Sequence, residues 1–436
     1  MRVLHKPHPL AMFSTWFLVV FLVLFPKGGI KIGPLPVTWG YLFLAFSLLP
    51  LAIVRLLAFP LRWPKRVLFA LALLMPIQLL FLYAAVFYGV ADPSFAFSTV
   101  VGLFVLPWIF LLVYPAFLSL IDGDRLSLYL RWSMLLAALW GIFLYFLHPL
   151  TGHFVEIPYL TVNAGDYGDI EATKHIARGL FMKLISTYNN GNVYGVATLI
   201  LLPLYRELEH VRWRRIALLI ALLLTLSRTV WVGLVLLEIF PLIALLTWQV
   251  WTFPILHLRT AVRRIEVATV TIVLVFGALL FNSLGSGALR FLFDPTAGGR
   301  INEIKVVISS RITLLPSQPV SGFLEILYSS AAQGYGWMGL VALVLLLVSP
   351  ILLLVVQPEA LHSRIRRAAL QGLILYIVLA GMDGALNYIP VMAFYWFAYM
   401  VYLFGWPGRP HGVPASHVAH VAEAPAGAAS IERVGA

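Results

Sequence analysis

The chain has 436 residues and is far more apolar than a soluble protein, with 61% hydrophobic and only 11% charged residues. Soluble domains are typically about one quarter charged, so an ordinary soluble enzyme is excluded. There is no cysteine, which excludes disulfides, thiolate metal sites and a cysteine nucleophile. The formal net charge is +12, and the positions of the basic residues along the chain decide what that charge means.

Apolar runs of about 17–25 residues recur along almost the whole chain, and this length crosses a bilayer as a helix. The first run follows Arg2 and Lys6 and lacks a small-residue cleavage site after it, which predicts an uncleaved span. We therefore expect an all-α polytopic membrane protein with one transmembrane domain over residues 1–407 and a disordered cytoplasmic tail over 408–436. About 12 transmembrane helices are predicted, at 10–26, 37–54, 67–90, 97–120, 128–148, 192–205, 214–226, 229–249, 265–283, 338–356, 368–384 and 391–406.

Basic residues mark the cytoplasmic loops of membrane proteins. If both termini are cytoplasmic, 20 of the 30 Lys and Arg residues fall on that side, so we interpret the net charge as a topology signal and expect no nucleic-acid partner. These residues are Arg2, Lys6, Arg55, Arg62, Lys65, Arg66, Arg125, Arg131, Arg206, Arg212, Arg214, Arg215, Arg259, Arg263, Arg264, Arg364, Arg366, Arg367, Arg409 and Arg433.

The remaining basic residues lie where the same rule predicts few. Lys27 and Lys31 fall in the first outer loop and are interpreted as interfacial anchors. The others lie in two long outer loops, at about 149–191 and 284–337, or at a break within the membrane. They are candidates for binding an anionic group: Lys174, Arg178, Lys183, Arg228, Arg290, Arg300, Lys305 and Arg311.

Each long loop contains a pattern typical of an amphipathic helix at the membrane interface. In 169–186, apolar residues share one face, and Lys174 and Arg178 lie on the other; this segment is either a lid or anchor, or it meets an anionic head group. In the second loop Arg300 and Arg311 are three helical turns apart on one face, an arrangement that suits phosphate binding, with membrane anchoring as the alternative.

Arg228 interrupts the apolar stretch 216–247, where a charge is costly unless it is paired or faces a cavity. We interpret it as lining an outward-facing vestibule, with snorkelling to the interface as the alternative. Asp383 is expected at the same outer end, together with Asn387. Glu325, close to Tyr328, is the acidic residue best placed to act as a base near the outer arginines. Asp122-Gly-Asp124 is interpreted as a turn.

Four ordered motifs over residues 185–405 resemble the O-antigen polymerase and O-antigen ligase superfamily of bacterial inner-membrane glycosyltransferases. The motifs are Asn190-Gly-Asn192-Val-Tyr-Gly195, Leu226-Ser-Arg228-Thr-Val-Trp231, Gly299-Arg300 before a helix ending in Pro319-Val-Ser-Gly322, and Leu324-Glu325-Ile-Leu before Gly336-Trp-Met-Gly339. The ligases have His-Asn eleven residues before the glycine that Gly336 matches. Glu325-Ile326 stands there in this chain, which favours a polymerase-like member.

The resemblance implies a glycosyltransferase-C-like fold and transfer of a glycan from undecaprenyl pyrophosphate to a sugar hydroxyl on the periplasmic face, without a metal or cofactor. It gives Glu325 the role of base and Arg228 and Arg300 that of stabilising the leaving group. A polysaccharide chain-length regulator is a possible partner. A ligase that transfers finished polymer to lipid A-core, and a polysaccharide transporter, stay open as alternatives. Expected substrate contacts are Arg311, Arg290, Lys174, Arg178, Asn192, Tyr328 and Asp383.

Overall fold

The computed structural model describes most of the helical part of the chain. The described residues are 9–32, 35–44, 53, 57, 63–168, 177–178, 181–249, 305, 307–309, 311–322, 326–386 and 388–407. The helices are α1 (Pro9–Val19), α3 (Lys65–Tyr88), α4 (Pro93–Val100), α5 (Leu106–Trp108), α6 (Tyr114–Phe117), α7 (Gly123–Thr151), α9 (Gly191–Leu208), α10 (Arg212–Leu224), α11 (Arg228–Gln249), α14 (Leu327–Val356), α15 (Arg364–Asp383) and α16 (Ile389–Phe404). Two antiparallel hairpins join β1 (Gly29–Ile32) to β2 (Leu35–Thr38) and β3 (Ala177–Arg178) to β4 (Phe181–Met182).

The fold is mostly helical, as the sequence predicts. Among the described residues, five helices are long and apolar enough to cross a membrane: α3, the continuous stretch Pro93–Leu120 that includes α4 to α6, α7, α14 and α15. Helices also occupy five more predicted spans, at α1, α9, α10, α11 and α16. The predicted span 265–283, half of 37–54 and the tail 408–436 lie outside the described residues, so the number of 12 spans stays a prediction.

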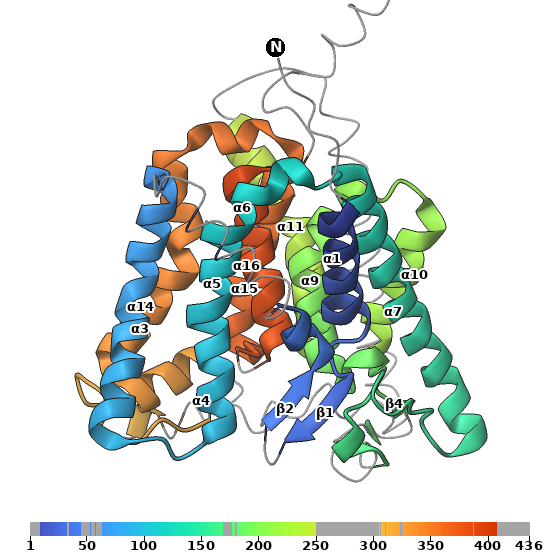
Figure 1. Ribbon diagram of the computed structural model, residues 1–436, viewed down its shortest axis with the longest axis horizontal. Helices are drawn as coiled ribbons and strands as arrows, with labels where there is room; N and C mark the ends of the chain where they lie inside the picture. Colours follow the sequence, from blue (N-terminus) through green and yellow to red (C-terminus); the bar gives the residue numbers. More distant parts are fainter. Residues whose placement is uncertain are drawn as a thin grey trace, which may run out of the picture.

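The long helical segments, with α4 to α6 counted as one, run back and forth between two ends of the bundle, and the connections lie at these ends (Figure 1). At one end the Trp406 indole donates to the Gly123 carbonyl at 2.9 Å, and the Gln357 amide donates to the Leu403 carbonyl at 3.3 Å. At the other end the Val320 N–H donates to the Gly89 carbonyl at 3.0 Å. We call the first the arginine-rich end and the second the loop-rich end, because the long connections lie there.

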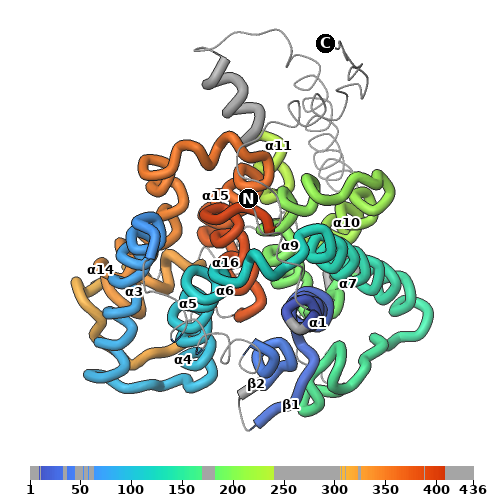
Figure 2. The backbone as a smooth tube through the Cα atoms, turned by 45° about the horizontal axis from the view of Figure 1, so that its top comes forward, coloured from blue at the N-terminus to red at the C-terminus, as the bar shows by residue number. Residues whose placement is uncertain are grey.

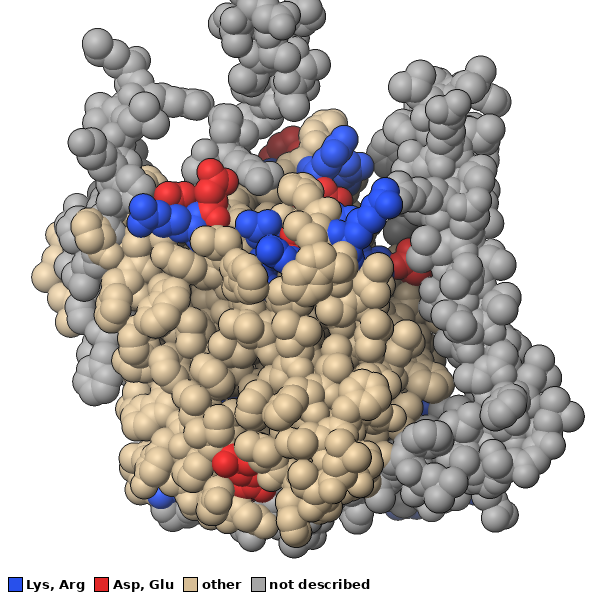
Figure 3. All heavy atoms as spheres, turned by 90° about the vertical axis from the view of Figure 1, so that its right-hand side faces the viewer, with Lys and Arg blue, Asp and Glu red and all other residues tan. Residues whose placement is uncertain are grey.

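Charged side chains lie at the two ends of the bundle. Figure 3 shows Lys and Arg gathered along the upper edge, which is the arginine-rich end, above an uncharged flank. This sorting agrees with the expectation that one set of basic residues marks one side of a membrane. The loop-rich end has its own basic residues, at Lys27, Lys31, Lys183, Arg228 and Arg311.

Several helices begin at a residue whose side chain caps the first turn. Asp92 accepts hydrogen bonds from the Ser94 and Phe95 N–H groups at 3.0 Å and begins α4, and Asn190 begins α9 in the same way. Asp122 caps α7 through the Asp124 and Arg125 N–H groups. The side chain of Asp122 is therefore occupied in satisfying helix donors. Asp122-Gly-Asp124 is thus the start of α7, not the turn that the sequence predicts.

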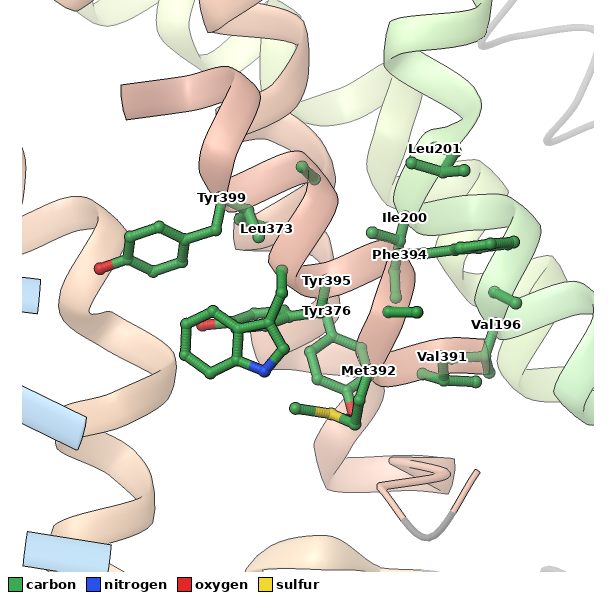
Figure 4. Close-up of a cluster of buried hydrophobic side chains, with 14 of the residues drawn as sticks. Val196, Ile200, Leu201, Leu373, Tyr376, Val391, Met392, Phe394, Tyr395 and Tyr399 are labelled. Atoms are coloured by element: carbon green, nitrogen blue, oxygen red, sulfur yellow. The ribbon is translucent and has the colours of Figure 1, made fainter. Parts of the chain in front are cut away.

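The core is formed by α9, α15 and α16, which lie at the centre of the bundle in Figure 2. Figure 4 shows their side chains interleaved, with Ile200, Leu373 and Tyr395 fully buried. A Cβ at Gly372 would collide with the Ile200 carbonyl, so this glycine lets the backbones of α15 and α9 approach closely. Small residues at helix crossings are how membrane helices gain packing contacts, because lipid chains provide no hydrophobic driving force.

The predicted amphipathic helix at 169–186 is wrong where the structure describes it. Ala177–Arg178 and Phe181–Met182 pair as antiparallel strands, and the following residues Leu184 and Ile185 are buried in irregular backbone. The Leu184 N–H donates to the Leu224 carbonyl at 3.0 Å, at the end of α10. This distant contact competes with the local helical pattern, and the pattern alone gave no sign of it.

The second predicted interfacial helix also ends earlier than expected. Residues 305 and 307–309 are helical, whereas 311–322 are not. The Thr313 and Leu314 carbonyls instead accept the Trp337 and Met338 N–H groups at 3.0 and 3.1 Å. Arg311 therefore does not continue a helix that begins near Arg300, and the argument that placed both on one helical face fails.

Gly336 divides α14 into two helices. Its φ of 72° lies in the left-handed region, and a Cβ there would stand 2.6 Å from the Thr313 carbonyl oxygen. Only glycine avoids both penalties. The second half of α14 begins after Gly336, close to position 338 where the sequence places the start of a span, and residues 327–335 form a separate helix at the loop-rich end.

Glu209 organises the arginine-rich end. Its side chain is fully buried between α9 and α10, accepts the Val211 N–H at 2.9 Å, and lies 3.3 Å from Arg214 and 3.7 Å from Arg131. Burial alone would raise the pKa of this carboxyl. The Val211 N–H and the two arginines outweigh burial and hold the pKa below its ordinary value. Glu209 is thus an ionised link between α7, α9 and α10.

Glu209→Gln should lower the stability of the folded protein at neutral pH by about 3 kcal/mol, because it leaves buried guanidinium groups without their anion. A depressed carboxyl pKa gives stability that is present above the unfolded pKa and lost as the pH falls through the folded value. The wild type should therefore lose more stability than the variant between pH 7 and pH 4. Thermal unfolding in detergent measures both effects.

Glu207→Gln, at an exposed position two residues earlier, is the control. Equal losses of stability in Glu207→Gln and Glu209→Gln would contradict the role of Glu209.

Candidate functional site

The loop-rich end contains a group of polar side chains held by helix ends. The first is Asn192, in the first turn of α9. Asn190 caps this turn by accepting the N–H groups of Asn192 and Val193 at 2.9 and 3.4 Å. A Cβ at Gly191 would stand 2.5 Å from the Leu184 carbonyl oxygen, so the turn is packed directly against the preceding loop. The backbone that presents Asn192 is therefore fixed on both sides.

Asn192 contacts Asp383, the last residue of α15. The Asn192 Nδ2 donates to Asp383 Oδ2 at 2.8 Å, and Asp383 is only 8% exposed. The Asn192 Oδ1 is buried and has no hydrogen-bond partner among the described residues. An unsatisfied buried acceptor costs free energy. It can be satisfied by a hydroxyl donor from a bound molecule.

Tyr328 approaches the same helix end from the start of α14. Its hydroxyl donates to the Ile377 carbonyl at 2.6 Å, and its ring would lie 3.5 Å from a Cβ at Gly381, two residues before the end of α15. On the other side, the Tyr376 hydroxyl donates to the Gly384 carbonyl. These two tyrosines hold the end of α15 that presents Asp383.

Arg228 opens α11 directly after the break that follows α10. Leu226 in this break has a φ of 48°, a conformation that is rare for residues other than glycine. The Leu224 carbonyl accepts the Leu184 N–H, so the break is tied to the loop that precedes α9. Val230, half a turn into α11, packs against Gly195 of α9. The half-buried Arg228 therefore lies at the helix end next to the one that presents Asn192.

Two lysines at this end lie closer to the site than the sequence indicated. The Lys27 ammonium lies 5.1 Å from the centre of the Tyr388 ring, in the connection that follows Asp383. Lys183 is only 7% exposed, just before the Leu184 contact with α10. The sequence predicts an interfacial anchor at Lys27 and an outer-loop position for Lys183. The apolar residues next to Lys183 in the sequence are the signal from which its burial could have been predicted.

The structure brings together only some of the predicted site residues. Asn192, Asp383, Tyr328 and Arg228 lie at the ends of neighbouring helices. Arg311 is exposed in the segment bound to the middle of α14, and no contact among the described residues joins it to Asn192 or Asp383. The Arg178 backbone lies in β3. The remaining predicted residues lie outside the described part of the chain: Glu325, Arg300, Arg290, Lys174 and Asn387.

The described group consists of side chains that are able to bind a polar molecule. A buried carboxylate and amide can bind hydroxyl groups, and cations at the same end of the bundle can attract an anionic one. Within the described ranges no three His, Asp or Glu residues cluster in a way that could hold a metal ion.

Asn192→Asp should lower the stability of the folded protein by about 1–3 kcal/mol, because it places two carboxylates in hydrogen-bond contact without a donor between them. The exchanged variant Asn192→Asp with Asp383→Asn restores one amide and one carboxylate, and should recover most of the loss. Thermal unfolding of both single variants and the double variant measures the coupling. Additive losses would mean that the two side chains do not interact.

We compared the chain with models of known protein families and with curated proteins. Neither comparison finds a match.

Proposed function

We propose that the chain is a surface-polysaccharide polymerase of the O-antigen polymerase type. In this function it joins undecaprenyl-pyrophosphate-linked repeat units on the periplasmic face of a bacterial inner membrane. The observation that carries the proposal is the polar group at the loop-rich end, where Asn192 and Asp383 form a buried hydrogen-bonded pair beside the helix break at Arg228. It lies at the end opposite the arginine-rich one, as a periplasmic site with both termini cytoplasmic requires.

The proposed reaction moves one glycan from lipid to sugar. An acceptor hydroxyl attacks the anomeric carbon of the donor, the bond from that carbon to the pyrophosphate oxygen breaks, and undecaprenyl pyrophosphate leaves. Glu325 accepts the hydroxyl proton. Arg228 and Arg300 stabilise the negative charge that grows on the pyrophosphate, and preorganised cations in a water-poor site do this more effectively than solvated ones. The step needs no metal or cofactor.

Two further features support recognition of a glycan at this end. The unpartnered Oδ1 of Asn192 can accept a hydrogen bond from a sugar hydroxyl. The carboxylate of Asp383 is a stronger acceptor for the same kind of donor. Both groups lie on helix ends rather than on loops, which fixes their positions relative to each other. Lys174, Arg178, Arg290, Arg311 and Tyr328 are proposed to contact the lipid pyrophosphate or the growing chain.

Arg228→Ala and Arg300→Ala should each reduce polymer formation by at least about 100-fold, because each removes a cation that stabilises the leaving group. Purified protein in lipid vesicles, supplied with a lipid-linked repeat unit, measures elongation directly on a gel. Arg367→Ala, an exposed arginine at the opposite end, is the matched control and should be fully active. Unchanged polymer length and yield in both site variants would remove the arginines from the mechanism.

Glu325→Gln should lower the rate by about 10²–10⁴-fold if the carboxylate accepts the hydroxyl proton. The same elongation assay measures it, and the pH dependence of the residual rate should lose the limb that reports the base. Full activity in Glu325→Gln would exclude it as the base. Inhibition by a chelator that Mg²⁺ reverses would contradict a metal-independent reaction.

The acceptor separates the polymerase from a ligase. A ligase would transfer finished polymer to lipid A-core and would not extend a lipid-linked repeat unit. A transporter would move the lipid-linked glycan across the vesicle membrane without changing its length. Elongation by the purified protein alone therefore distinguishes the polymerase from both other functions, and added chain-length regulator should change only the length distribution.

A further inference from the structure

A surface patch of arginine and tryptophan lies at the arginine-rich end, where α7 and α10 pack together. We call it the Arg–Trp patch and define it by Arg131 and Trp132 of α7 and by Arg212, Trp213 and Arg214 of α10. The Arg214 guanidinium lies 4.5 Å from the Trp132 ring centre and 5.5 Å from that of Trp213. Both rings are exposed, Trp132 by 39% and Trp213 by 53%.

The positive charge of the Arg–Trp patch exceeds the negative charge of the carboxylates that lie next to it. The two Glu209 oxygens are already used by the Val211 N–H, Arg214 and Arg131, and Glu238 pairs with Arg206. Arg212 is exposed and takes part in none of the ion pairs found among the described residues. The Arg214 Nε is buried and has no hydrogen-bond partner there. An anion at the patch would therefore meet the exposed guanidinium of Arg212, which none of these carboxylates neutralises.

Below the patch, both helices present apolar side chains outward. On α10 these are Trp213, Ile216 and Ile220, exposed by 53, 53 and 43% at helical spacing. On α7 they are Leu136 and Phe143, exposed by 43 and 49%. Figure 3 views the molecule from the side on which α7 and α10 lie and shows basic residues above an uncharged flank. A ligand that spans patch and flank needs an anionic head and long apolar chains.

We propose that the Arg–Trp patch binds an anionic phospholipid of the surrounding leaflet. Its phosphate contacts the exposed guanidinium of Arg212 and the partly exposed guanidinium of Arg214, because a guanidinium matches phosphate oxygens bidentately. Trp132 and Trp213 lie at the level of the head group, where tryptophan is favoured, and the acyl chains lie along α7 and α10. A free phosphate ion would use the arginines but neither the tryptophans nor the apolar flank, so the lipid accounts for more of the patch. This site is independent of the proposed polymerase activity.

Binding of individual lipids to the purified full chain in detergent tests this site by native mass spectrometry. Dioleoyl phosphatidylglycerol should bind more tightly than dioleoyl phosphatidylcholine. Arg212→Ala should weaken phosphatidylglycerol binding about fivefold, since a basic residue near an anionic lipid contributes on the order of that factor. Arg212→Ala with Trp213→Ala should weaken it further. Arg212→Lys keeps the positive charge but removes the planar guanidinium, so its affinity for phosphatidylglycerol should lie between those of the wild type and Arg212→Ala.

Arg364→Ala, an exposed arginine at the same end of the bundle on α15, is the matched control and should keep wild-type binding. The site would be overturned by equal affinity for the two lipids, by a loss in the control as large as that in Arg212→Ala, or by displacement of the lipid by millimolar inorganic phosphate. Arg212 and Trp213 are exposed, so their variants should unfold at the wild-type temperature. A lowered unfolding temperature would show that the patch supports the fold instead.

Discussion

The described structure depends on one constraint: a helix in hydrocarbon must satisfy its own backbone, and an unpaired charge cannot stay in the apolar layer. The uncharged flank in Figure 3 is the direct result. Among the described residues, charged side chains gather at the two ends, where Glu209 contacts arginines at one and Asn192 pairs with Asp383 at the other. Any activity must therefore be assigned to an end, and the charges divide the ends into two different environments.

Interruptions of helices provide the exceptions to this rule. The break between α10 and α11 opens the polypeptide at Arg228, and Gly336 separates the short first part of α14 from its spanning part. In both places a distant segment supplies the missing hydrogen bonds: Leu184 donates to Leu224, and the carbonyls of Thr313 and Leu314 accept from the second half of α14. The cost of irregular backbone is thus offset by segments that are held at the loop-rich end.

The same interruptions explain what could be predicted from the sequence. Apolar runs and basic residues depend on local composition, so most helices and the charge of the two ends were predicted, and Arg228 was recognised as an interruption. The interfacial helices were not predicted correctly, because the Leu184 and Thr313 contacts join segments far apart in the chain. The pairing of Asn192 with Asp383 spans 191 residues, so their common outer end could be inferred but their contact could not.

The close crossing of α9 and α15 connects the two ends. Gly372 lets α15 meet the Ile200 backbone near the middle of the bundle, and the same two helices continue to Asn192 and Asp383 at the loop-rich end. At the arginine-rich end, α9 leads into Glu209, and Arg366 of α15 donates to the carbonyls of Tyr402 and Leu403 at 2.7 and 3.1 Å. The Asn192–Asp383 pair is therefore positioned by the tightly packed core.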